Sequence, residues 1–178
     1  MAYHGVLIPS AIAAKNIDIF NRSVIVSGSD VDNGNVLQLG AKSVNYGEQE
    51  VFVATPNSGS SFLSGLWMAY TGEEIPITDS RYKGLDPDPR SFFNPSGKVF
   101  SAFRPQVGDI VTLTADAVTG GSAAFVNAAP GALKLAFGAS QTAGALSFKV
   151  LRTTYISIGT GAIDSQRTVA YELECIAS

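Results

Sequence analysis

Few side chains in this sequence could carry out acid–base or nucleophilic chemistry. The chain contains one histidine, His4, and one cysteine, Cys175. A Ser-His-Asp or Cys-His site requires a histidine as its base, and His4 stands close to the N-terminus, where we expect a mobile segment. Cys175 belongs to an alternating run with Val169, Tyr171 and Leu173, so its thiol is interpreted as a small apolar group on a buried strand face. We therefore predict that the protein is not an enzyme.

The sequence also lacks the usual ligand sets for metals and phosphates. One cysteine and one histidine cannot complete a zinc site. Residues 30–35 begin like a calcium loop, but Asn35 stands where the loop needs glycine, and Ala41 stands where it needs glutamate. Asp86 and Asp88 have no third ligand nearby and are interpreted as turn residues. Since no glycine-rich phosphate loop is present either, we expect no metal and no cofactor.

Composition narrows the choice of partners. Charged residues make up only 15% of the chain, compared with about 25% in typical soluble domains. Such a surface is either partly buried in an interface or kept soluble by Ser, Thr, Asn and Gly. The net charge of −3 and the scattered basic residues argue against nucleic-acid binding. With no apolar run of about 18 residues and no secretory signal pattern, we expect no membrane partner and synthesis in the cytoplasm.

Period-two patterns bounded by turn residues predict strands along most of the chain. The Asn33-Gly34 dipeptide predicts a hairpin between the first two of these strands. Residues 110–116 alternate apolar and polar side chains, which predicts a half-buried antiparallel strand. A phase shift at Val150-Leu151 predicts a bulge in a long strand near the C-terminus. The expected strands cover residues 23–26, 35–40, 50–54, 65–70, 98–103, 110–116, 132–137, 146–158 and 167–176.

These strands predict an all-β fold, an antiparallel β-sandwich or barrel with long irregular loops and an N-terminal arm. Residues 1–22 are assigned to that arm or to a first strand, and residues 23–178 to a single β-rich domain. The short patterns within residues 1–22 do not distinguish a helix from an extended segment.

The prolines of residues 71–97 rule out a continuous helix or a central strand there. A proline-rich loop holds its shape with few contacts, so it is either a connector or a contact surface. The phenylalanines that follow it either anchor the loop to the body or form an apolar patch for a partner. Trp67 and Tyr70 lie in an apolar run and are predicted to pack in the core. The predicted interface residues are Tyr82, Leu85, Asp86, Pro87, Asp88, Arg90, Phe92 and Phe93.

Three pairs of segments together resemble small proteins that decorate the capsids of tailed phages, known as decoration or cement proteins. They are EVFVAT (50–55) with GLWMAY (65–70), GLDPDPR (84–90) with FRPQVGD (103–109), and FKVL (148–151) with TYISIGTG (154–161). The likeness covers roughly residues 45–176, and its motifs are turns and core positions, from which no binding residue can be transferred.

The resemblance implies a non-enzymatic structural protein of the virion that binds the outer surface of the expanded capsid and stabilises the head. Its partners would be the major capsid protein and further copies of itself, as a dimer or trimer around a local symmetry axis. It would be made in the host cytoplasm and located on the capsid exterior. The alternative is a β-module, also on a virion, that binds a carbohydrate or host receptor. An aromatic side chain in a concave polar site would favour the alternative, whereas a flat or arm-like apolar surface would favour capsid decoration.

Overall fold

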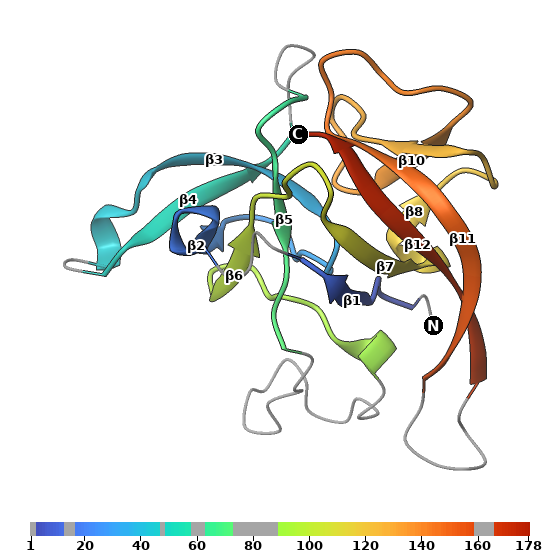
Figure 1. Cartoon of the computed structure of the whole chain (residues 1–178). Helices are drawn as coiled ribbons and strands as arrows, with labels where there is room; N and C mark the ends of the chain where they lie inside the picture. The colour runs from blue at the N-terminus through green and yellow to red at the C-terminus, as the bar shows by residue number, and fades with distance from the viewer. Residues whose placement is uncertain (1–2, 13–16, 47–48, 58–62, 73–88, 159–165) are drawn as a thin grey trace.

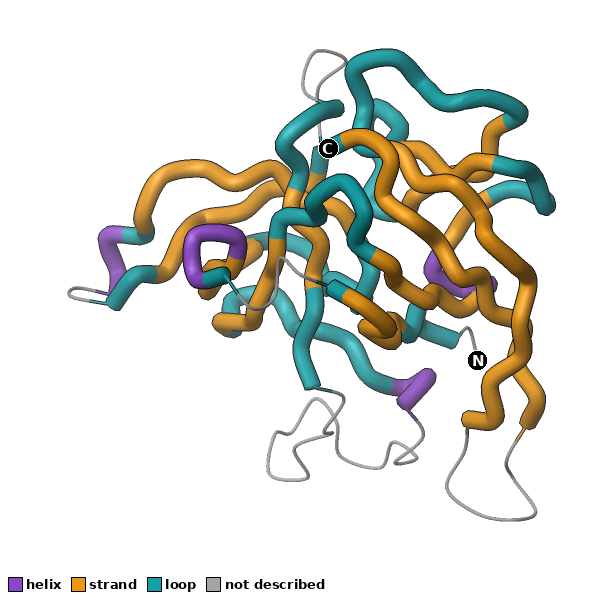
Figure 2. The backbone as a smooth tube through the Cα atoms, in the orientation of Figure 1, coloured by secondary structure: helices purple, strands orange, loops and turns teal. Residues whose placement is uncertain are grey.

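The computed structural model describes residues 3–12, 17–46, 49–57, 63–72, 89–158 and 166–178. In this part of the chain the regular structure consists of twelve strands and several single-turn 3-10 helices (Figures 1 and 2). No helix in these ranges is long and apolar enough to cross a membrane. The strands are β1 (Leu7–Ala11), β2 (Asn21–Val26), β3 (Val36–Lys42), β4 (Val51–Pro56), β5 (Trp67–Ala69), β6 (Val99–Phe103), β7 (Ile110–Thr114), β8 (Val118–Thr119), β9 (Phe125–Asn127), β10 (Leu135–Gly138), β11 (Ser147–Ile158) and β12 (Gln166–Ala177).

The first sheet closes into a five-stranded barrel in the order β2-β4-β3-β5-β6. β2 completes the ring because it pairs in parallel with β4 on one side and antiparallel with β6 on the other. Alternate residues of β2 face the interior, so Val24 and Val26 are buried while Ser23 is exposed. Closure of the ring removes most free strand edges from this half of the molecule, although residues 38–42 of β3 extend past β5.

The second sheet has seven strands in the order β1-β7-β12-β11-β9-β10-β8. Its centre is the hairpin of β11 and β12, two strands of twelve residues each. β1, which lies in the segment assigned to an arm or a first strand, pairs antiparallel with β7 at one edge. Figure 1 shows this sheet beside the barrel, with the far end of the β11/β12 hairpin extending beyond the other strands.

The two sheets bury a common core. The larger apolar cluster joins Met68 and Phe103 of the barrel to Leu113 and Phe148 of the seven-stranded sheet. A second cluster fills the barrel and contains Trp67, as predicted for that side chain. Since the larger cluster draws on both sheets, neither sheet buries its apolar face without the other.

The all-β prediction is confirmed, with one barrel and one open sheet. The bulge is also confirmed, because the register between β11 and β12 shifts between Val150 and Arg152. Two pairings, β2 with β4 and β8 with β10, are parallel, which the sequence pattern did not indicate.

The predicted hairpin at Asn33-Gly34 is wrong. β2 pairs with β4 and β6, and β3 pairs with β4 and β5, so the two strands joined by residues 30–35 are not neighbours. Val31, Asn33 and Asn35 are buried, and the segment turns through the interior of the protein. Long-range hydrogen bonds to this segment, described below, outweigh the local preference of Asn-Gly for a hairpin.

β7 was predicted to be half-buried, and that prediction is also wrong. Val111 and Leu113 are buried on one face, and Thr112 and Thr114 are buried on the other. The Thr114 hydroxyl accepts a hydrogen bond from the Val6 N–H at 3.0 Å, which satisfies a polar group on the face that the pattern placed in water.

We expect Gly34→Ala to lower the free energy of unfolding by about 2 to 4 kcal/mol. Gly34 has φ +87°, and an added Cβ would lie 2.7 Å from Cδ2 of Leu113, so the substitution combines backbone strain with crowding. Gly28 is the matched control, because it has φ +88° and nothing within 4 Å of the added Cβ. Gly28→Ala should cost only about 1 to 2 kcal/mol in urea denaturation. Equal losses for the two variants would contradict the close contact with Leu113.

Candidate functional site

Most of the predicted interface lies outside the described residues. Tyr82, Leu85, Asp86, Pro87 and Asp88 belong to the range 73–88, outside the part of the chain that the structure describes. The remaining three residues, Arg90, Phe92 and Phe93, are described. Arg90 and Phe92 are only 5% and 4% exposed, and Phe93 is half-buried.

The segment that follows the proline-rich loop is fastened to the N-terminal residues. The guanidinium carbon of Arg90 lies 4.3 Å from the ring centroid of Tyr3, and the Arg90 carbonyl accepts a hydrogen bond from the His4 N–H at 2.8 Å. The rings of His4 and Phe93 are 5.0 Å apart. These contacts, together with the burial of Phe92, are those of an anchor, and they leave Arg90 and Phe92 little surface to offer a partner.

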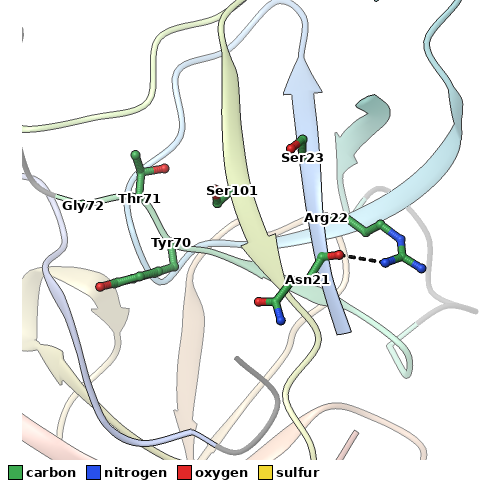
Figure 3. A pocket seen from close by; sticks show the side chains of 7 residues that line it. All are labelled: Asn21, Arg22, Ser23, Tyr70, Thr71, Gly72 and Ser101. Atoms are coloured by element: carbon green, nitrogen blue, oxygen red, sulfur yellow. Dashed lines mark hydrogen bonds between the residues drawn. The ribbon is translucent and has the colours of Figure 1, made fainter. Parts of the chain in front are cut away.

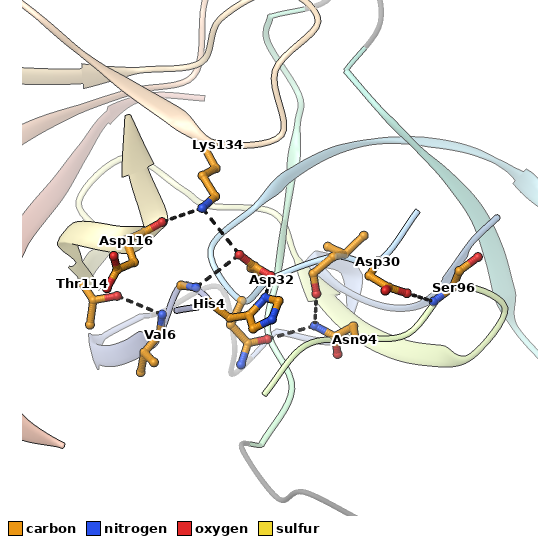
Figure 4. Close-up of polar contacts among 12 residues, drawn as sticks. His4, Val6, Asp30, Asp32, Asn94, Ser96, Thr114, Asp116 and Lys134 are labelled. Carbon is orange, nitrogen blue, oxygen red and sulfur yellow. Dashed lines mark hydrogen bonds and ion pairs between the residues drawn. The ribbon is translucent and has the colours of Figure 1, made fainter. Parts of the chain in front are cut away.

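A charged cluster surrounds Asp32 (Figure 4). His4 Nδ1 donates to Asp32 Oδ1 at 2.6 Å, and the Gly5 N–H donates to Oδ2 at 3.2 Å. Lys134 Nζ lies 3.6 Å from the same Oδ2 and donates to the Asp116 carbonyl at 2.7 Å. Because groups from two other segments, residues 4–5 and Lys134, engage both oxygens of Asp32, this carboxylate serves as a structural anchor for the chain.

A buried amide network lies next to this cluster. Asn94 Nδ2 donates to the Val31 carbonyl at 3.0 Å and to Asn33 Oδ1 at 3.2 Å. The same Asn33 Oδ1 accepts from the Thr71 N–H, and Asn33 Nδ2 donates to the Thr71 carbonyl. The backbones of Val31 and Asn94 exchange two further hydrogen bonds. The network ties residues 30–35 to Thr71, which follows β5, and to Asn94, which precedes β6.

These polar groups do not form a catalytic constellation of a known kind. Within the described ranges, no three His, Cys, Asp or Glu side chains gather where they could hold a metal ion. Burial raises the pKa of the Cys175 thiol from its ordinary value of 9.0 to about 12, so the thiolate that nucleophilic attack requires is scarce near neutral pH. Its thiol packs in the shared core, as the alternating pattern predicted.

A shallow hollow opens beside the start of β2 (Figure 3). It has a volume of about 330 Å³, at the small end of the range for ligand pockets. Tyr70 lies on one side of it, and this tyrosine also packs partly against the shared core. The lining residues are Asn21, Arg22, Ser23, Tyr70, Thr71, Gly72 and Ser101.

A second hollow of about 280 Å³ shares Asn21, Arg22 and Ser23 with the first and is also lined by Asp18 and Glu50. The Arg22 guanidinium lies over the rings of Phe52 and Trp67 at 5.6 and 5.8 Å, which fixes its position. The hydrogen bond that Lys42 donates to Glu50 lowers the pKa of the Glu50 carboxyl below its ordinary value. The two hollows present hydroxyl, amide and charged groups that suit a polar ligand.

The outer wall of the barrel carries an apolar patch next to the hollow. Ile25 of β2 is registered with Val53 of β4 on one side and with Val99 of β6 on the other. Val53 is 38% exposed, Val99 is 41% exposed, and Ile25 is half-buried. We call these three side chains the wall patch. They form an apolar row across three neighbouring strands on the outside of the barrel.

Sequence reasoning missed both the wall patch and the hollow. Residues 50–54 are apolar almost throughout, so the pattern does not show which side of the strand faces water. The pairing of β2 with β4 and β6 brings the three residues of the wall patch together, and the pairing of β2 with β6 brings Ser23 next to Ser101 in the hollow. No local signal in the sequence indicates these pairings.

Comparisons with known proteins do not identify the chain. No protein-family model matches it, and no curated protein or solved structure matches it significantly.

We expect Asn94→Ala to lower the free energy of unfolding by about 1 to 3 kcal/mol. The variant removes two buried hydrogen bonds, each worth about 0.5 to 1.5 kcal/mol, while the Val31 carbonyl and Asn33 Oδ1 each keep a second donor. The control is Asn45→Ala, at an exposed position, where a change within about 0.5 kcal/mol is expected. Chemical denaturation measures both variants, and an Asn94→Ala protein as stable as the control would show that the network contributes nothing.

Proposed function

We propose that this chain is a structural, non-enzymatic protein that attaches to the outside of a tailed-phage capsid and stabilises the head. The observation that carries the proposal is the wall patch, because an exposed apolar row on the outer wall of a barrel, with no hollow among its three side chains, suits a protein surface better than a small ligand. The low content of charged residues agrees with a surface that is partly buried in an assembly. The resemblance to decoration proteins in turn and core segments points the same way.

The proposed mechanism is linkage between binding and shell stability. A protein that binds the assembled shell but not its separated subunits stabilises the shell by mass action. Many copies on a symmetric lattice add their contributions, so a modest affinity for each copy is sufficient. The barrel suits this role because β2 is paired on both sides, with β4 and with β6, which holds the three side chains of the wall patch in a fixed register.

We expect the protein to sediment with empty expanded capsids of its own phage and to raise their melting temperature. Val53→Glu should weaken binding at least about tenfold, because contact with the shell would bury an unpaired carboxylate. Val107→Glu is the matched control, since Val107 is 68% exposed and lies in the loop between β6 and β7, outside the wall patch. Wild-type protein that stays in the supernatant would refute the proposal, and equal binding by the two variants would refute the role of the wall patch.

A second candidate function is glycan or receptor binding in the hollow. It is favoured by the position of Tyr70 beside hydroxyl and amide groups in a concave surface, since aromatic rings and polar groups of this kind recognise sugars. The open shape and small volume limit how much of a ligand could be buried, so we place this function second.

The second candidate predicts binding to a glycan array that one variant abolishes and another leaves intact. Ser101→Tyr should abolish it, because the larger side chain fills the hollow from β6. Val53→Glu, on the wall patch, should leave it unchanged. A wild-type protein that binds no glycan on the array would eliminate this candidate.

A further inference from the structure

The far end of the β11/β12 hairpin forms a two-stranded ribbon without strand neighbours among the described residues. β11 pairs with β9 only through Ser147–Lys149, and β12 pairs with β7 only through Ala170–Glu174. Residues 155–158 and 166–169 are therefore paired only with each other, and residues 153 and 154 are paired only with β12. We call residues 153–158 and 166–169 the distal ribbon. Figure 1 shows it projecting past the rest of the sheet. An isolated two-stranded ribbon is at best marginally stable in water, so this length of paired strand calls for a partner.

The hydrogen-bonding register shows which backbone groups of β11 are unpaired. The Cys175 N–H donates to the Asp109 carbonyl, and the Cys175 carbonyl accepts from the Gly108 N–H, so the odd-numbered residues of β12 face β7. The even-numbered residues face β11, where they are registered with Thr154, Ile156 and Ile158. It follows that the backbone groups of the three intervening residues face outward, away from β12. These residues are Thr153, Tyr155 and Ser157.

Among the described residues, the other strand edges carry features that protect them, whereas this one does not. Residues 38–42 of β3 extend past β5 but contain a register shift and Lys42, and the edge strand β8 has only two residues. In β1 the register puts residue 9 on the outward-facing side, and this residue is a proline without an N–H. On the far side of the distal ribbon, β12 offers a shorter unpaired stretch that contains the charged Arg167. Residues 153–158 of β11 contain no charge, no proline and no bulge, the usual devices against edge pairing.

We propose that the outward edge of β11 pairs antiparallel with the same edge of a second copy of this chain, around a twofold axis at Tyr155. This register places Thr153 of each copy opposite Ser157 of the other and the two tyrosines opposite each other, and such Thr–Ser and aromatic pairs are favourable. Arg152, the charged residue of β11 next to this edge, lies opposite Ile158, so the two Arg152 side chains do not face each other. An edge strand that pairs with itself in this way gives a closed dimer.

Two side-chain contacts prepare the edge for this pairing. The Arg167 guanidinium lies 4.6 Å from the centroid of the Tyr155 ring and holds an aromatic side chain that is 53% exposed. Arg152 Nε donates to Glu172 Oε2 at 2.7 Å across the β11/β12 hairpin, so the Arg152 charge is already paired within its own chain. The ribbon is therefore partly ordered before association, and this reduces the entropy lost on binding.

The dimer is independent of the proposed attachment to a capsid, and its test uses the full-length protein alone. We expect sedimentation equilibrium to show a monomer–dimer system. Ser157→Pro should raise the dissociation constant about tenfold to a hundredfold, because it removes two intermolecular hydrogen bonds per dimer. It removes no backbone hydrogen bond within the chain, since the Ser157 N–H faces outward. The matched control is Val169→Pro, which removes an outward N–H from the opposite edge of the ribbon and should leave the dissociation constant unchanged.

Hydrogen exchange gives a second readout that does not depend on a variant. The amides of Thr153, Tyr155 and Ser157 should exchange more slowly as the protein concentration rises, while that of Val169 should not respond. A wild-type protein that stays monomeric at about 100 μM would overturn the proposal. So would a trimer, which a twofold contact cannot build, and so would equal weakening by the two proline variants. Circular dichroism of each variant shows whether the fold is retained.

Discussion

A buried polar loop, residues 30–35, fixes how the barrel and the open sheet meet. Asp32 engages the N-terminal residues and Lys134, and Asn33 bonds to Asn94 in the segment before β6. Buried carboxylates and amides lose their hydration on folding, so their burial is favourable only when the partners from all these segments arrive together. The apolar core holds both sheets close to each other, but apolar contact is not directional. The polar loop adds the directional constraint that selects one arrangement.

The same loop explains which parts of the fold could be predicted from the sequence. Alternation and turn residues are local properties, and they located most of the strands and the bulge next to Val150. Which strands pair with each other is not determined by local sequence. The Asn33-Gly34 dipeptide has the chemistry of a hairpin turn. However, the Asn33 side chain and the Gly34 N–H form hydrogen bonds with residues about 35 to 60 positions away, and β2 and β3 do not pair with each other. β7 was misjudged for a related reason, since the Thr114 hydroxyl is buried against the Val6 N–H, 108 positions earlier in the chain.

The candidate site was harder to predict than the fold. Arg90 and Phe92 were selected because they flank a rigid loop, but phenylalanine next to a loop fits an anchor as well as an interface, and only burial distinguishes the two. The wall patch depends on the parallel pairing that brings Ile25 and Val53 together, and a parallel pair leaves no turn signal in the sequence. The outward edge of β11 had a local signal, a long uncharged run of β-branched and aromatic residues, but its exposure depends on where β9 ends.

The two proposed surfaces belong to different parts of the molecule, and this has a consequence for binding. The wall patch lies on β2, β4 and β6 of the barrel, whereas the self-pairing edge lies on β11 of the open sheet, so a copy that has formed a dimer retains its wall patch. Three side chains provide little apolar area, and a single copy should hold a shell weakly. A dimer brings two patches in one rigid unit, and the second contact then forms at a high effective concentration. The small wall patch and the unprotected edge of β11 are thus physically compatible, because pairing through the edge compensates for the weak binding of a single patch.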